Sequence, residues 1–130
     1  MASAMPYLAV AVGGAIGSIA RFWLTGVMLH LTGPRFPWGT LLINVLGSFV
    51  IGLVAGMSLT PERITLHPDL RIFVMTGVCG GFTTFSAFSL EAALLWQRSQ
   101  PLALTVYVIM SVILSVSAVF AGMGAARLMT

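Results

Sequence analysis

The chain alternates between long apolar stretches and short polar segments. The polar segments collect turn-forming residues such as Gly33, Pro34, Pro68 and Pro101. Each apolar stretch exceeds the roughly 20 residues with which a helix crosses the hydrocarbon core of a bilayer. The pattern therefore predicts an all-α, multi-pass integral membrane protein with four transmembrane helices and with both termini on the same side. The expected spans are about residues 4–31, 38–59, 70–96 and 102–128.

Composition places this protein in lipid rather than in water. Hydrophobic residues make up 58% of its 130 residues and charged residues only 7%, whereas a soluble domain carries about 25% charged residues. The length suits one domain, residues 1–130, that consists of the four spans and little else.

Several classes of function find no support in the residues. The arginines are scattered, which argues against a nucleic-acid partner. Cys79 is the single cysteine, so an internal disulfide and a Cys-rich metal site are excluded. His30 and His67 lack metal-ligand spacing, and neither a phosphate loop nor a nucleophile–base pair is recognisable. Nothing in the sequence argues for an enzyme.

The arginines give little information on orientation in the membrane. The net charge of +3 comes from six arginines and three acids, without lysine. The positive-inside rule compares their numbers on the two sides, and a balanced count would let two copies insert in opposite senses and pair antiparallel. The alternative is that six arginines are too few for this rule. The side of the membrane that holds both termini would have Arg63, Arg71 and Arg127. The opposite side would have Arg35 and Arg98, with Arg21 as a further candidate.

The third span contains the segment Thr76–Ser89, which is a poor helix sequence. It holds three glycines followed by the pair Thr83-Thr84. We expect the helix to break here, near the middle of the membrane, where irregular backbone must be buried in protein or line a cavity. Carbonyls freed at such a break can coordinate a cation. The alternative is a glycine-rich packing notch in an intact helix.

Polar residues recur at helical spacing on two spans. Three positions four residues apart form one stripe on a helix, and hydroxyl and amide groups there can either serve a small permeating ion or bond a neighbouring helix. The buried amide of Asn44 would be costly if unpaired. The stripes are Thr40, Asn44 and Ser48 on the second span and Tyr107, Ser111 and Ser115 on the fourth.

Aromatic and charged residues add further candidates near the break. Phe85 and Phe88 share a helix face, and the positive edges of their rings could face an anion, although such residues are more often core or lipid-facing. Glu91 and Arg21 are membrane-embedded charges and functional candidates by default. Glu91 could carry protons, bond a pore group or pair with an arginine, and Arg21 would attract anions at a pore mouth.

Small residues repeat at four-residue spacing on three spans, which favours close helix packing. The pairs are Gly13 and Gly17, Gly52 and Gly56, and Gly122 and Ala126.

Three motifs together resemble the Fluc (also called CrcB) family of fluoride channels, over nearly the whole chain. The first is Gly13-Gly14-Ala15-Ile16-Gly17 followed by Arg21. The second runs from Gly39-Thr40 through Asn44 to Gly47-Ser48-Phe49 and Gly52. The third, which is the most specific, runs from Thr76-Gly77 through Gly80-Gly81 and Thr83-Thr84-Phe85-Ser86-Ala87-Phe88-Ser89 to Glu91.

The resemblance implies a fluoride-selective channel that exports fluoride passively and so protects against fluoride toxicity. It implies a dual-topology antiparallel homodimer with two pores in the plasma membrane, that is, the bacterial inner membrane. A structural sodium ion at the dimer centre would be bound by the backbone carbonyls of Gly80 and Thr83 of each subunit. The implied pore residues are Asn44, Phe85, Phe88, Tyr107, Ser111 and Ser115, with Thr40 and Glu91 as a hydrogen-bonding pair near one pore end and Arg21 in the vestibule.

Two departures from the family pattern affect details. Ala87 replaces a usual threonine between the pore phenylalanines, and Leu114 replaces a common glycine before Ser115.

Three other functions remain open. A small proton-coupled multidrug exporter has similar size, but it uses a carboxylate in its first span, whereas Glu91 is in the third. A non-transporting membrane assembly subunit and a fluoride–proton antiporter are the other two.

Overall fold

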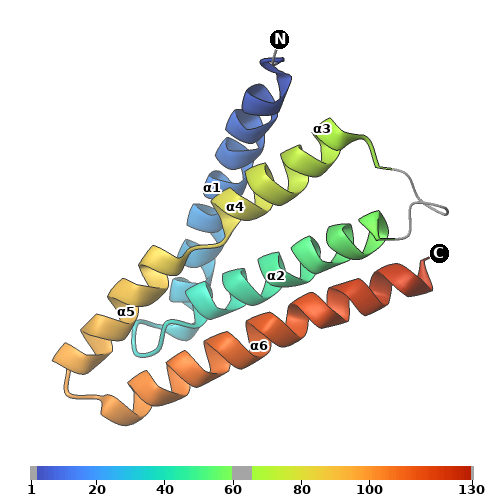
Figure 1. Ribbon diagram of the computed structural model, residues 1–130. Helices are drawn as coiled ribbons and strands as arrows, with labels where there is room; N and C mark the ends of the chain where they lie inside the picture. Colours follow the sequence, from blue (N-terminus) through green and yellow to red (C-terminus); the bar gives the residue numbers. More distant parts are fainter. Residues whose placement is uncertain (1–2, 60–65, 130) are drawn as a thin grey trace.

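The computed structural model describes residues 3–59 and 66–129, and these residues fold into helices joined by short connections (Figure 1). Four helical spans are long and apolar enough to cross a membrane, and each end lies within two residues of the expected one. The prediction of four transmembrane helices is thereby confirmed. Glu62 and Arg63, which entered the charge count, lie outside the described residues. The spans are α1 (Met5–Thr32), α2 (Trp38–Ser58), a composite third span (Pro68–Gln97) and α6 (Pro101–Leu128).

The third span is interrupted near its middle, as the sequence predicts. Thr83 and Thr84 have extended backbones, with φ/ψ of −82°/155° and −151°/118°, between the helical segments on either side. Within the expected segment the break lies at the two threonines, and Gly80 and Gly81 are still helical. The span consists of α3 (Pro68–Arg71), the π-helical segment η1 (Ile72–Cys79), α4 (Gly80–Phe82) and α5 (Phe85–Gln97).

Glycines in the first half of the third span serve close packing against α1. Gly77 lies against Gly13, and a Cβ added to Gly81 would come within 2.5 Å of the carbonyl oxygen of Gly14. A Cβ on Gly17 would collide with the carbonyl oxygen of Val78. Helix backbones in membranes approach this closely only where side chains are small. The predicted packing role of the α1 pair is confirmed.

The other small residues form a second seam, between α2 and α6. Gly52 faces the backbone of Val119, and Gly122 faces the backbone of Phe49. α2 packs more extensively against α6 than any other pair of elements does among the described residues. The two seams place the break between α1 on one side and the α2–α6 pair on the other.

The buried core is small, and much apolar surface is exposed. Leu41, Leu95 and Tyr107 form the buried cluster of side chains, whereas Phe22 is 84% and Phe85 is 79% exposed. Such a surface suits contact with lipid or with another subunit. The α1–α2 loop and the α5–α6 turn lie at one end of the molecule, at the lower left of Figure 1, and α3 and the C-terminus lie at the other.

We predict that Gly17→Ala destabilises the protein, because the new methyl group collides with the backbone of η1. Overpacking of this kind costs about 1–3 kcal/mol. Thermal unfolding of the purified protein in detergent measures the effect.

Gly26→Ala is the matched control, because nothing lies within 4 Å of the added Cβ. Alanine should leave stability unchanged or raise it slightly at this helical position. Equal melting temperatures for the two variants would contradict the packing described for α1 and η1.

Candidate functional site

The break in the third span is held from the α1 side by Arg21. Its guanidinium Nε donates a hydrogen bond of 3.0 Å to the carbonyl oxygen of Gly81. This carbonyl belongs to the last turn of α4, whose carbonyls lose their usual donors when the helix stops. Arg21 therefore binds the broken helix end.

Asn44 holds the break from the α2 side with both ends of its amide. Its Nδ2 donates to the carbonyl oxygen of Thr84 at 3.1 Å, and its Oδ1 accepts from the backbone N–H of Thr84 at 2.8 Å. The Thr84 hydroxyl then caps α5 by accepting from the N–H of Ala87 at 3.0 Å. The expected alternative of an interhelical hydrogen bond is confirmed for Asn44, and one of its two N–H groups has no described partner.

A cavity of about 420 Å³ opens beside the break, and we call it the serine cavity. None of the residues that line it is charged, and it gathers five of the predicted pore residues. Among the side chains in the described part of the chain, only the hydroxyl of Ser111 is buried without a hydrogen-bond partner. The lining includes Asn44, Ser48, Cys79, Gly80, Thr83, Thr84, Phe85, Phe88, Ser111 and Ser115.

The two phenylalanines lie together at this cavity, with ring centroids 5.5 Å apart and planes tilted by 52°. Phe88 also contacts Tyr107, at 5.1 Å between ring centroids. Phe85 is 79% exposed, so its ring lies at the surface of the chain. Ring edges, hydroxyls and one free amide N–H can all approach a small anion here.

Thr40 and Glu91, the predicted pair, are hydrogen-bonded, and Tyr107 also hydrogen-bonds Glu91. The Thr40 hydroxyl donates to Oε1 of Glu91 at 2.7 Å, and the Tyr107 hydroxyl donates to Oε2 at 2.9 Å. Both side chains that donate are buried. The structure thus brings Tyr107 to Glu91, and the Tyr107 hydroxyl is engaged at that carboxylate.

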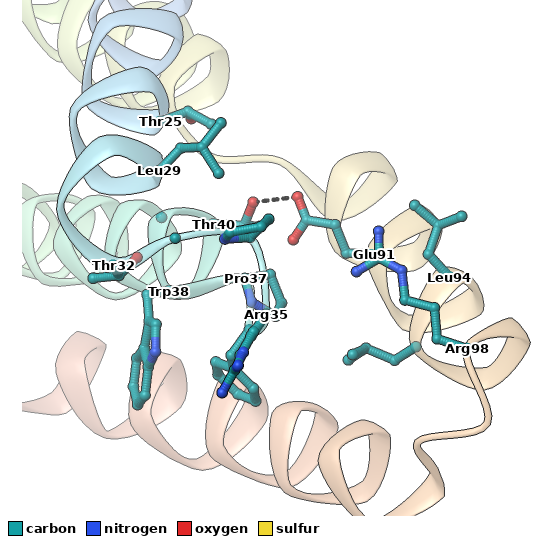
Figure 2. Close-up of a pocket in the computed structure, with 15 residues that line it drawn as sticks. Thr25, Leu29, Thr32, Arg35, Pro37, Trp38, Thr40, Glu91, Leu94 and Arg98 are labelled. Carbon is teal, nitrogen blue, oxygen red and sulfur yellow. Dashed lines mark hydrogen bonds between the residues drawn. The ribbon is translucent and has the colours of Figure 1, made fainter.

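A second cavity, of about 240 Å³, lies on the other side of Glu91. We call it the arginine cavity, because Arg35 and Arg98 line it together with Glu91 and Thr40 (Figure 2). Its walls come from the end of α1, the α1–α2 loop, the start of α2 and the C-terminal part of α5. Glu91 and Thr40 line this charged cavity, and Tyr107 connects Glu91 to Phe88, which lines the serine cavity.

The break leaves two backbone carbonyls that could bind a cation. In the described ranges no hydrogen bond reaches the carbonyl oxygen of Gly80 or Thr83, whereas Cys79, Gly81 and Thr84 all accept one. Gly80 is exposed, and a Cβ there would meet nothing within 4 Å. Unpaired carbonyl oxygens are hard ligands of the kind that alkali cations prefer. His, Cys, Asp and Glu side chains form no metal-binding group within the described residues.

Some residues at the site are not among the site residues predicted from the sequence. Thr84 caps α5, and a threonine directly before an apolar helical run is a usual signal of a helix start. Ser48 belonged to a recognised stripe and lines the serine cavity, as does Cys79. For Arg35 and Arg98 the sequence predicts only a shared side of the membrane, and no local pattern indicates that they line one cavity.

Replacing Asn44 should loosen the break. Asn44→Ala leaves both backbone groups of Thr84 without their partner, and each unsatisfied group costs about 1–3 kcal/mol. Asn44→Asp keeps the acceptor and loses the donor, so its melting temperature should fall between those of the wild type and Asn44→Ala.

Ser48→Ala is the control for this series, because Ser48 lies one turn away and makes no hydrogen bond to other described residues. It should melt close to the wild type. If Asn44→Ala has the same melting temperature as Ser48→Ala, the two hydrogen bonds to Thr84 contribute nothing to stability.

Comparison with known proteins places the chain in a family. The family model described as CrcB-like protein, Camphor Resistance (CrcB), matches residues 8–123. A relative from Rhizobium leguminosarum bv. trifolii is 50% identical over 120 residues, which are 92% of this chain and 94% of the relative. One from Nitrobacter hamburgensis is 50% identical over 123 residues, 94% and 95% of the two chains, and one from Rhodospirillum rubrum is 47% identical over 118 residues, 91% and 92%.

All three relatives are named fluoride-specific ion channels. The matched region includes the break, both polar stripes and every residue of the candidate site. Because the family model and the relatives cover nearly the whole chain, the chain belongs to the CrcB family.

Proposed function

We propose that this protein is a fluoride-selective channel that lets fluoride leave the cell passively and thereby protects against fluoride toxicity. The observation that carries the proposal is 50% identity, over 92% of this chain, to a relative named a fluoride-specific ion channel. The proposed location is the inner membrane of a bacterium, which agrees with four spans and with the bacterial relatives. The function proposed is transport and not catalysis.

The chemistry of the serine cavity supports passage of a small anion. Fluoride holds its water tightly, so a pathway must offer hydrogen-bond donors in place of that water. The cavity offers the unpaired Ser111 hydroxyl, the Ser115 hydroxyl, one amide N–H of Asn44 and the ring edges of Phe85 and Phe88. None of these groups carries a fixed charge, and conduction requires binding weak enough for the ion to leave.

Thr40, Glu91 and Tyr107 mark one end of the proposed pathway. The two hydroxyls donate to the carboxylate, which fixes their orientation and offsets part of the Glu91 charge. Arg21 is assigned mainly to holding the break, and an additional role in a vestibule would use the part of its guanidinium not bonded to Gly81.

The pathway is proposed to be completed in an antiparallel homodimer with two pores. A side chain as large as Phe85 that is 79% exposed beside a polar cavity suits a partner subunit as its second wall. The near balance of arginines between the two sides allows both orientations in the membrane.

A sodium ion at the dimer centre is proposed as a structural cofactor. The carbonyl oxygens of Gly80 and Thr83 fit this role, because they lack donors within the described residues and Gly80 lies open at the protomer surface. Two carbonyls from each subunit would give four oxygen ligands. When bound, the ion would supply positive charge that holds the two breaks together.

We expect liposomes with the purified protein to lose fluoride rapidly and to retain chloride. A fluoride electrode and a chloride electrode on the same vesicle preparation measure both ions. Phe85→Ile and Phe88→Ile should each lower fluoride flux at least tenfold, which corresponds to about 1.4 kcal/mol of lost stabilisation of the ion in transit.

Size-exclusion profiles control for folding of these variants. Wild-type protein that is folded but loses no fluoride would exclude the channel and favour the assembly subunit. Flux that needs a proton gradient and disappears in Glu91→Gln would favour the drug exporter, and fixed proton stoichiometry would favour the fluoride–proton antiporter.

Removal of sodium should weaken the dimer. Replacing sodium with the bulky cation N-methylglucamine should lower the melting temperature and shift the protein toward the monomer, because four carbonyl dipoles would then face one another without a cation. Crosslinking yield and thermal unfolding measure this. The same stability in both cations would remove sodium from the proposal and leave the channel function untouched.

A further inference from the structure

The arginine cavity holds more positive than negative charge. Two guanidinium groups, those of Arg35 and Arg98, and one carboxylate, that of Glu91, line it. The two oxygens of Glu91 accept hydrogen bonds from Thr40 and Tyr107, and neither arginine pairs with this carboxylate. Within residues 3–59 and 66–129, neither Arg35 nor Arg98 makes a hydrogen bond or an ion pair through its side chain.

The position of the two arginines relates them to Glu91. Arg98 directly follows the last residue of α5 and lies about two turns after Glu91, so the two residues lie near the same side of the helix. Figure 2 shows the Arg98 side chain extending back along α5 toward Glu91. Arg35 comes from the facing wall, the loop between α1 and α2. An anion in this cavity would therefore lie between two positive charges and next to Glu91.

We propose that Arg35 and Arg98 form an anion-recruiting vestibule at the Glu91 end of the pathway. This inference rests on the proposed channel function. A carboxylate at a pore end repels anions, and two guanidinium groups in the same cavity reverse the sign of the local potential. Guanidinium groups stay charged at all physiological pH values, so this recruitment does not depend on pH.

A guanidinium pair at a membrane boundary could also bind the phosphate of a lipid headgroup. We assign the pair to the permeating anion because both arginines line the same cavity as Glu91 and Thr40. Glu91 is linked to the serine cavity by its hydrogen bond with Tyr107 and by the ring contact of Tyr107 with Phe88. The experiment below separates the two ligands.

The test compares fluoride efflux of the wild type with that of the double variant Arg35→Gln with Arg98→Gln, in vesicles of neutral lipid. Flux is measured at about 0.01 M and about 1 M ionic strength, set with potassium gluconate, where the Debye length is about 30 Å and about 3 Å. At low salt the double variant should lose up to about half of the flux. In an antiparallel dimer the two pores point in opposite directions, so fluoride enters only one of them through this vestibule. The expected loss is therefore limited to about half of the flux.

The deficit should shrink toward zero at high salt, because mobile ions then screen the arginines in the wild type as well. Arg35→Lys with Arg98→Lys keeps the charge and should conduct like the wild type. Arg71→Gln removes one exposed arginine at the far end of the molecule and should also conduct like the wild type at both salt concentrations. The single variants Arg35→Gln and Arg98→Gln serve if the double variant does not fold.

Four results would overturn the inference. They are full flux in the double variant at low salt, an equal loss in Arg71→Gln, a loss that salt does not change, and a loss that occurs only in vesicles with anionic phosphatidylglycerol, which would assign the arginines to lipid headgroups. Absence of fluoride flux in the wild type would be a different result, since it would overturn the proposed function itself.

Discussion

The interruption of the third span at Thr83 and Thr84 is the constraint on which the rest of the structure depends. Two extended residues inside an apolar helix free backbone groups that lipid cannot satisfy. Arg21 of α1 donates a hydrogen bond to the Gly81 carbonyl, and Asn44 of α2 hydrogen-bonds both the N–H and the carbonyl of Thr84. Two neighbouring spans are thus fixed to the break through hydrogen bonds, and the tight glycine contacts of α1 bring Arg21 close enough to reach it.

Some polar side chains near the break hydrogen-bond other protein groups, whereas others have no protein partner among the described residues and can bind a ligand. Asn44, Thr40 and Tyr107 are engaged with protein partners, whereas the buried Ser111 hydroxyl has none among the described residues. A buried hydroxyl without a partner is costly, so the Ser111 hydroxyl is available to a hydrogen-bonding ligand. Of the polar groups on the two stripes, Ser111 has the buried hydroxyl that makes no hydrogen bond among the described residues, and contact of this hydroxyl with fluoride belongs to the proposed function.

No charged residue lines the serine cavity. Glu91 accepts hydrogen bonds from two hydroxyls, is linked to the serine cavity through Tyr107 and Phe88, and lines the arginine cavity together with Arg35 and Arg98. Neutral donors can strip water from an anion without trapping it, while charges near the openings raise the local concentration of the ion. A division of this kind would let one protein combine entry of a strongly hydrated ion with its release.

The sequence alone determined the four spans, the segment in which the third breaks and the helix faces that carry polar residues, because hydrophobic runs, weak helix formers and helical periodicity are local properties. The family motifs also pointed to residues that the structure gathers at one cavity. Only the tertiary structure decided which residues of that segment are extended, namely Thr83 and Thr84. It also decided that Asn44 hydrogen-bonds Thr84 and that Tyr107 and Thr40 both hydrogen-bond Glu91. The paired residues are 40 positions apart for Asn44 and Thr84, 51 for Thr40 and Glu91, and 16 for Tyr107 and Glu91. The reach of one helix to another depends on how closely their backbones pack, which no local pattern contains.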